Sequence, residues 1–278
     1  MIDRKAIEFQ RLHMPGNCFI MANAWNAGSA VLLEQAGFGA IGTTSAGIAY
    51  SHGLADAETA LSFDSALRET CEISDAVSIP VSMDSENVYA DAPAAVFENM
   101  KRIAATGVVG ASIEDYCGDR RHPLYDIELA VERVRAAKQA VAELDYPFVL
   151  TARAECYLYG SPDPFKDSVE RVNRYREAGA DCLYVPGIRD LDTIRELVDA
   201  VDGPVNVVMG LSGTPISLAE LRQAGVTRIS IGGSLARATF GVVRRAAKEM
   251  LEQGSFDFSS EQIPDAELSK LFSRRTDN

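Results

Sequence analysis

Several residue types that mark particular classes of protein are scarce in this chain of 278 residues. Its five cysteines are an odd number without metal-binding spacing, which argues against a disulfide framework. Its three histidines lie far apart in the sequence, so a histidine-rich zinc site is not expected. No apolar run is long enough to cross a bilayer. The sequence therefore favours a globular protein that is not built around disulfides, zinc or a membrane span.

Positive charge is also in short supply. The chain has 27 basic and 40 acidic residues, which gives a formal net charge of -13. This charge repels phosphate backbones and anionic lipid heads, and the sequence shows no local basic patch that would offset it. Residues 1–13 are charged and amphipathic and lack a signal-peptide core. We therefore expect a cytoplasmic protein with no nucleic-acid partner and no membrane partner.

The most regular feature of the sequence is a short apolar run followed by a stretch with helical periodicity, repeated along the chain. Eight such runs alternating with about eight helices predict a closed parallel (β/α)8 barrel, or TIM barrel, and a doubly wound open sheet is the competing architecture. The runs are CFIMAN (18–23), GAIGTT (39–44), IPVSMD (79–84), VGASIED (109–115), PFVLTAR (147–153), DCLYVPG (181–187), PVNVVMG (204–210) and RISIGG (228–233).

The domain organisation is predicted to be simple. No linker rich in Pro, Gly or Ser divides the chain, so residues 1–278 are expected to form one barrel domain with an N-terminal helix. Residues 255–278 follow the last predicted strand and its helix. We expect this tail to form an extra helix that packs on the outside of the barrel or on another subunit.

Acidic residues gather at the ends of two neighbouring predicted strands. Asp84 ends the third run, Glu86 lies two residues further on, and Glu114 lies at the end of the fourth run beside Asp115. In a barrel the catalytic groups lie at the carboxyl ends of the strands, so these three side chains can converge. Three carboxylates held together repel one another unless a hard cation such as Mg²⁺ or Mn²⁺ lies between them. The alternative is that they cap helices or lie in solvated loops.

Two further strand ends carry groups that suit an anionic substrate. Arg153 ends the fifth run, and its planar fork matches a carboxylate in a two-point contact. Its alternative role is a structural salt bridge. Thr43 and Thr44 end the second run, Ser45 and Ala46 follow it, and these small residues offer amides and hydroxyls. No lysine lies at a predicted strand end, so a Schiff-base aldolase is not expected.

Five short motifs, in the same order, resemble the isocitrate lyase / phosphoenolpyruvate mutase superfamily from about Asn23 to Gly241. Each is weak alone, but together they are specific. The motifs are Gly53-Leu54-Ala55-Asp56, Asp84-Ser85-Glu86, Ile113-Glu114-Asp115, Ala152-Arg153-Ala154-Glu155 and Pro204-Val205-Asn206.

The resemblance implies a barrel that binds Mg²⁺ (or Mn²⁺) and a 2-oxo acid, and that stabilises a pyruvate enolate. It implies that Asp84, Glu86 and Glu114 hold the metal, directly or through waters, and that Asp56 is an outer catalytic group. It implies that the substrate carboxylate meets Arg153 and the loop of Thr43, Thr44, Ser45 and Ala46, and we add Trp25 and Asn206 to the expected substrate-binding residues. Family members are commonly homotetramers that exchange a C-terminal helix, so a dimer or tetramer is expected.

The chain departs from the lyases after the fourth run. Their Lys-Lys/Arg-Cys-Gly-His loop is replaced by the short segment YCGDRRHPLY, in which Tyr116 and His122 are candidate proton donors. The favoured function is carbon-carbon cleavage of an oxaloacetate-like 2-oxo acid, by retro-aldol cleavage or decarboxylation. One alternative is carbon-phosphorus chemistry on phosphonopyruvate, with Arg120 and Arg121 as further cations. The other is a barrel that binds keto acids without catalysis.

Overall fold

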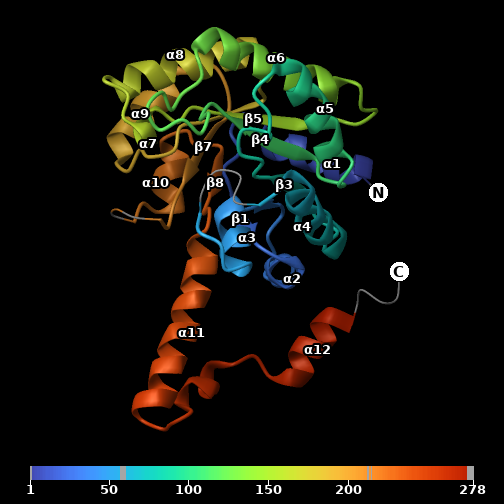
Figure 1. The fold of residues 1–278 in the computed structure, drawn as a ribbon, viewed down its shortest axis with the longest axis vertical. Coiled ribbons are helices and arrows are strands. Elements are labelled where there is room, and N and C mark those ends of the chain that lie inside the picture. The colour runs from blue at the N-terminus through green and yellow to red at the C-terminus, as the bar shows by residue number, and fades with distance from the viewer. Residues whose placement is uncertain (1, 57–60, 212, 214, 274–278) are drawn as a thin grey trace.

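The computed structural model describes residues 2–56, 61–211, 213 and 215–273, and its centre is a closed barrel of eight parallel strands (Figure 1). The predicted (β/α)8 barrel is confirmed, and every strand lies within or beside one of the eight apolar runs. The strands are β1 (Phe19–Ala24), β2 (Ile41–Thr43), β3 (Val81–Met83), β4 (Gly110–Glu114), β5 (Val149–Arg153), β6 (Cys182–Tyr184), β7 (Val205–Val208) and β8 (Arg228–Ser230).

The strand order excludes the doubly wound alternative. Each strand pairs in parallel with the next one in the sequence, and β1 also pairs with β8 through Phe19 to Arg228 and Met21 to Ser230. Because every pairing in the closed sheet is parallel, all eight strands present their carboxyl ends at one face. That face therefore gathers the residues that follow each strand.

Helices surround the barrel, and most of them begin where the sequence supplies a cap. Asn26, Ser62, Asp126, Asp190 and Ser217 each accept a hydrogen bond from a backbone amide in the first turn of the helix that follows. The helices are α1 (Ile2–Leu12), α2 (Ala27–Gln35), α3 (Ser45–Ser51), α4 (Phe63–Ala76), α5 (Pro93–Ala104), α6 (Ile127–Ala142), α7 (Cys156–Tyr159), α8 (Pro164–Glu177), α9 (Leu191–Ala200), α10 (Leu218–Gln223), α11 (Ser234–Glu252), the 3₁₀ helix η1 (Asp257–Glu261) and α12 (Asp265–Ser273).

Helix α1 closes the amino-terminal end of the barrel. Phe9 is fully buried in a small apolar cluster with Met21 and Val149. The adjoining His13 is also buried, with its Nδ1 2.8 Å from the carbonyl oxygen of Phe9 and its Nε2 3.3 Å from Nη1 of Arg228. The amino-terminal end of the barrel is therefore filled by side chains, and a binding site is expected at the carboxyl-terminal end.

The C-terminal segment leaves the barrel. Figure 1 shows α11 projecting from the barrel, after which the chain turns back through η1 to α12. Helix α12 lies against α2 of the same chain, where the ring of Phe272 approaches Gly28. Large apolar side chains are exposed along this segment, among them Phe240, Val243, Leu251, Phe256 and Ile263. Throughout the described part of the chain, every helix is too short or too polar to cross a membrane.

Candidate active site

A cavity of about 590 Å³ opens at the carboxyl ends of the strands. Many of the residues that follow the strands line it, as the barrel architecture requires. Nine of the predicted site residues are among them: Thr44, Ser45, Ala46, Asp56, Asp84, Glu86, Glu114, Tyr116 and Arg153.

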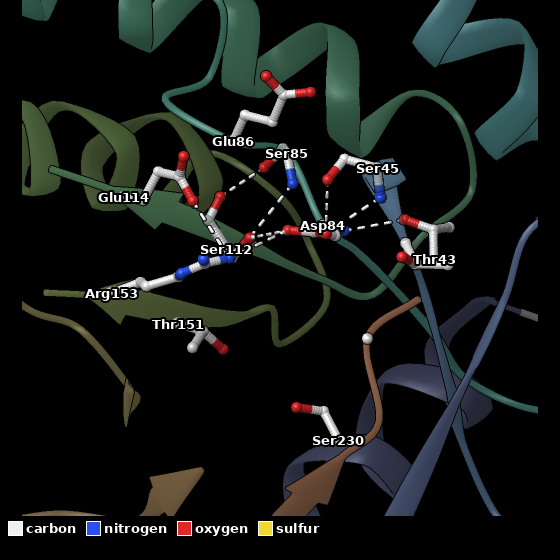
Figure 2. A network of polar contacts seen from close by, with 12 residues as sticks. Thr43, Ser45, Asp84, Ser85, Glu86, Ser112, Glu114, Thr151, Arg153 and Ser230 are labelled. Atoms are coloured by element: carbon white, nitrogen blue, oxygen red, sulfur yellow. Dashed lines mark hydrogen bonds and ion pairs between the residues drawn. The ribbon is translucent and has the colours of Figure 1, made fainter. Parts of the chain in front are cut away.

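Asp84 is held in place by hydroxyl and amide groups of the neighbouring strands (Figure 2). Its Oδ2 accepts hydrogen bonds from the amide of Ser45 (3.1 Å) and from the Ser45 hydroxyl (3.0 Å). The backbone amide of Asp84 donates to Oγ1 of Thr43 at 2.9 Å. Ser45 therefore orients the carboxylate of Asp84, and Thr43 fixes its backbone.

Glu86 lies on a loop with an unusual backbone. Glu86, Val88 and Tyr89 have φ angles of 48°, 61° and 53°. These angles lie in the left-handed region of the backbone, which residues other than glycine rarely adopt. Figure 2 shows the Glu86 carboxylate directed away from Asp84. The hydroxyl of Tyr89 donates to Oε1 of Glu86 at 3.3 Å. Glu86 thus reaches the cavity wall without meeting Asp84.

Arg153 is the cation at the centre of the acidic cluster. Its Nη1 lies 3.2 Å from Oε2 of Glu114 and 3.9 Å from Oδ1 of Asp84, and its Nε is in direct contact with Oε1 of Glu155. The aromatic ring of Tyr184 lies 5.2 Å from the guanidinium carbon. Arg153 therefore links the ends of β3, β4 and β5.

The cluster carries more negative than positive charge. Burial, together with the charges of Glu155, Asp84 and Glu86, raises the pKa of Glu114 well above its ordinary value, although Arg153 opposes the shift. Burial raises the pKa of Glu155 to about 7, again against the effect of Arg153. These shifts indicate that one guanidinium does not neutralise the cluster, since each carboxylate disfavours the ionisation of its neighbours.

The composition of the cluster fits a hard divalent cation. Its donors are carboxylate oxygens, the kind that Mg²⁺ and Mn²⁺ prefer, and Oε2 of Glu155 is buried without a hydrogen-bond partner among the described residues. Within those residues, no three acidic, histidine or cysteine side chains already surround a common point. Arg153 contacts both Asp84 and Glu114, and Glu86 points elsewhere. The donor set is therefore suitable for the cation, while Arg153 bridges Asp84 and Glu114 in this arrangement.

Four predicted site residues do not line the cavity. His122 lies on the surface with 86% of its side chain exposed, so it does not face the acidic cluster. Asn206 is buried inside the barrel, where it donates to the hydroxyl of Ser230 (3.0 Å) and accepts from Nε of Arg228 (2.8 Å). Thr43 is buried below Asp84 as its hydrogen-bond partner, and Trp25 packs against the core.

Sequence reasoning predicted Tyr116 but missed the second half of an aromatic wall, which the segment after β5 supplies. Tyr159, at the end of α7, lines the cavity and stacks on Tyr116, with ring centroids 3.8 Å apart and planes 4° apart. Burial, with the charges of Glu155 and Glu114, raises the pKa of Tyr159, so its hydroxyl stays protonated. The sequence signal that could have identified Tyr159 was its position four residues after Glu155, in the segment that follows the fifth strand. Arg189 and Arg237 also line the cavity and were not predicted.

The closed parallel barrel with a buried cluster of carboxylates and one guanidinium at its carboxyl face is the architecture of TIM-barrel enzymes. Residues 9–251 match the family model described as phosphoenolpyruvate phosphomutase. The chain therefore belongs to this family, within the isocitrate lyase / phosphoenolpyruvate mutase superfamily.

Similar proteins in the superfamily differ in reaction. The 2-methylisocitrate lyase of Escherichia coli K12 is 30% identical over 234 residues, 77% of each chain. A Burkholderia cenocepacia J2315 structure, provisionally assigned as a lyase/mutase, is 45% identical with a TM-score of 0.94 and covers 98% of this chain and 96% of its own. The structure of a phosphonopyruvate hydrolase with oxalate and Mg²⁺ is 25% identical, with a TM-score of 0.87 and coverage of 98% and 96%. These relatives place the chain among enzymes that cleave carbon-carbon or carbon-phosphorus bonds.

Proposed function

We propose that the protein is a Mg²⁺- or Mn²⁺-dependent enzyme that cleaves a carbon-carbon bond in a small 2-oxo acid and forms the enolate of pyruvate. The observation that carries this proposal is the largely buried cluster of Asp84, Glu114 and Glu155 around Arg153, at the carboxyl end of the barrel. Asp84, Glu86 and Glu114 are the residues that would hold the cation. When bound, the cation supplies Lewis-acid polarisation of the 2-oxo group.

The chain's own residues would bind and orient the acid. The guanidinium of Arg153 offers N–H donors to the substrate carboxylate or to the developing enolate oxygen, because it lines the cavity and is fixed by Glu114 and Glu155. Ser45 keeps the carboxylate of Asp84 oriented at the cavity through two hydrogen bonds to Oδ2. Asp56, on the same cavity, is the outer acid of this arrangement, and burial and the charge of Asp84 raise its pKa.

Protonation of the enolate would come from the aromatic wall. Tyr116 and Tyr159 line the cavity as a stacked pair, and the raised pKa of Tyr159 keeps its hydroxyl in the form that can donate a proton. His122 is not part of this proposal, because its side chain lies on the surface.

A second candidate is the cleavage of a carbon-phosphorus bond in phosphonopyruvate. A phosphonate requires further cations, and Arg189 and Arg237 line the cavity without an ion pair among the described residues. Arg121, by contrast, has 86% of its side chain exposed, and neither it nor Arg120 lines the cavity. Product analysis separates the two reactions, since only the second releases inorganic phosphate.

The test of the proposed function is calorimetry with oxalate, a stable mimic of the pyruvate enolate, with and without Mg²⁺. We expect binding that requires Mg²⁺ and that disappears in Asp84→Asn. The matched control is Asp181→Asn, because Asp181 also accepts a backbone amide hydrogen bond but lies at the opposite end of the barrel. Absence of oxalate binding by the wild-type protein under both conditions contradicts the proposal. Oxalate binding without turnover on a panel of 2-oxo acids would favour the non-catalytic barrel.

A cytoplasmic homo-oligomer, a dimer or tetramer, belongs to the same proposal, with no nucleic-acid or membrane partner. The exposed apolar side chains along α11 and the following segment support the oligomer, because apolar patches of this kind commonly mark contacts between protein chains.

A further inference from the structure

The loop that carries Glu86 has a backbone that its own residues do not favour. Val88 is fully buried and has a φ angle of 61°, and the adjoining Tyr89 has a φ angle of 53°. A β-branched residue rarely adopts this left-handed conformation, because its Cβ crowds the neighbouring carbonyl groups. A strained backbone of this kind persists only when the surrounding structure imposes it. Something outside the loop must therefore hold it.

The loop's carbonyl groups show what holds it. Nη2 of Arg133 donates to the carbonyl oxygens of Asn87 (2.6 Å) and Ala90 (2.9 Å). Nδ2 of Asn99 donates to the carbonyl oxygens between them, those of Val88 (2.9 Å) and Tyr89 (3.3 Å). Four successive carbonyl groups thus accept hydrogen bonds from two side chains, one on α6 and one on α5.

Arg133 also connects this loop to the end of the next strand. Its side chain is only 1% exposed, and Nη1 donates to the carbonyl oxygen of Glu114 at 3.2 Å. Its guanidinium lies 3.8 Å from the ring centroid of Tyr125, whose hydroxyl donates to Oδ1 of Asp91 at 2.5 Å. The amide of Glu114 in turn donates to the carbonyl oxygen of Glu86 at 3.0 Å. One buried guanidinium therefore fixes the backbone next to two of the three proposed metal ligands.

We propose that Arg133 and Asn99 are positioning residues that hold the loop from Asp84 to Asp91 so that the carboxylate of Glu86 stays at the cavity. Neither side chain lines the cavity, so they act through the backbone of the loop. The inference rests on the proposed metal-dependent function, because it assigns Glu86 to the cation. It adds that affinity for the cation depends on two residues that do not touch it.

The experiment compares Arg133→Lys and Asn99→Leu with the wild-type protein by Mn²⁺ titration and by amide hydrogen exchange of residues 86–90. A lysine cannot reproduce the two-pronged donation, and leucine keeps the approximate shape of asparagine without its donors. Loss of a supporting group behind metal ligands typically lowers metal affinity by roughly 10- to 100-fold. We expect a decrease of that size in each variant, together with faster exchange in the loop.

The matched controls are Arg176→Lys and Asn173→Leu. These two residues of α8 also donate to backbone carbonyl groups, Arg176 to Asp202 and Ala180 and Asn173 to Ala200, but at the amino-terminal end of the barrel. We expect them to reduce thermal stability without changing Mn²⁺ affinity.

Three outcomes would overturn the inference. Unchanged Mn²⁺ affinity in Asn99→Leu and Arg133→Lys overturns it while leaving the proposed function intact. An equal loss in the control variants shows that general destabilisation is the cause. No Mn²⁺ binding by the wild-type protein removes the proposed function and the inference together. If Arg133→Lys does not fold, the Asn99→Leu result decides alone.

Discussion

The buried His13 predicts that the protein loses stability in mildly acidic solution. Burial, and next the charge of Arg228, lower the pKa of His13 from 6.5 to about 3. Because the Phe9 carbonyl can only accept, Nδ1 of His13 carries the proton, and Nε2 is left to accept from Arg228. Protonation of Nε2 would place two N–H groups against each other beside a positive charge. The folded protein therefore keeps this imidazole neutral.

The sign and size of the effect follow from these two pKa values. The unfolded chain binds the proton below about pH 6.5 and the folded chain only near pH 3, so a decrease in pH between these values favours unfolding. At about 1.4 kcal/mol per pH unit, acidification from pH 7 to pH 5 should cost about 2 kcal/mol of the free energy of unfolding. Above about pH 6.5 the imidazole of His13 is neutral in both the folded and the unfolded chain, so it causes no loss of stability there.

The assay is urea unfolding of the wild-type protein and of His13→Gln at pH 7 and pH 5. We expect the free energy of unfolding to decrease by about 2 kcal/mol more in the wild-type protein than in the variant, because glutamine does not titrate. His52→Gln is the control, since the His52 side chain is exposed and pairs with Glu69 at the surface. Parallel losses in the wild-type protein and His13→Gln would refute the reasoning.

Three further predictions concern the site and the surface. Arg153→Lys should lower kcat on the order of 10²-fold with the circular dichroism spectrum unchanged, because an ammonium group cannot keep the three carboxylate contacts; full activity would contradict this role. Tyr159→Phe should lower kcat on the order of 10²-fold with little change in KM, whereas Tyr50→Phe, on the same cavity, should not; equal effects would exclude Tyr159 as the proton donor. Leu251→Glu should shift the protein to smaller species in light scattering, because Leu251 is 88% exposed on α11, while Leu129→Glu on α6 should not; an unchanged mass would place the subunit contact elsewhere.

The barrel could be predicted from the sequence because each strand is buried on both faces and therefore appears as a short apolar run. The ends of these runs also located Asp84, Glu114 and Arg153, since the carboxyl ends of all eight strands meet at one face. Both predictions depend only on where each strand begins and ends in the sequence. Neither depends on the direction in which a side chain points.

The remainder of the site depends on side-chain direction and on loop shape. Asn206 is the second residue of β7, so it lies inside the barrel below the cavity. The direction of Glu86 depends on left-handed backbone angles for which its own loop supplies no glycine. Tyr159 reaches the cavity because α7 is a single turn that ends at Gly160, with a φ angle of 79°. None of these follows from the periodicity of the sequence.

The pairing of β1 with β8 has a consequence for how the protein is made. Phe19 of β1 pairs with Arg228 of β8, so β1 cannot pair on this edge until almost the whole chain has been synthesised. At a synthesis rate of roughly 5–20 residues per second, this edge stays open on the ribosome for on the order of ten seconds or more. An open parallel edge is a site of aggregation, and contacts between distant residues form slowly. We therefore expect the yield of native protein in a cell to depend more on chaperones during synthesis than on the stability of the finished barrel.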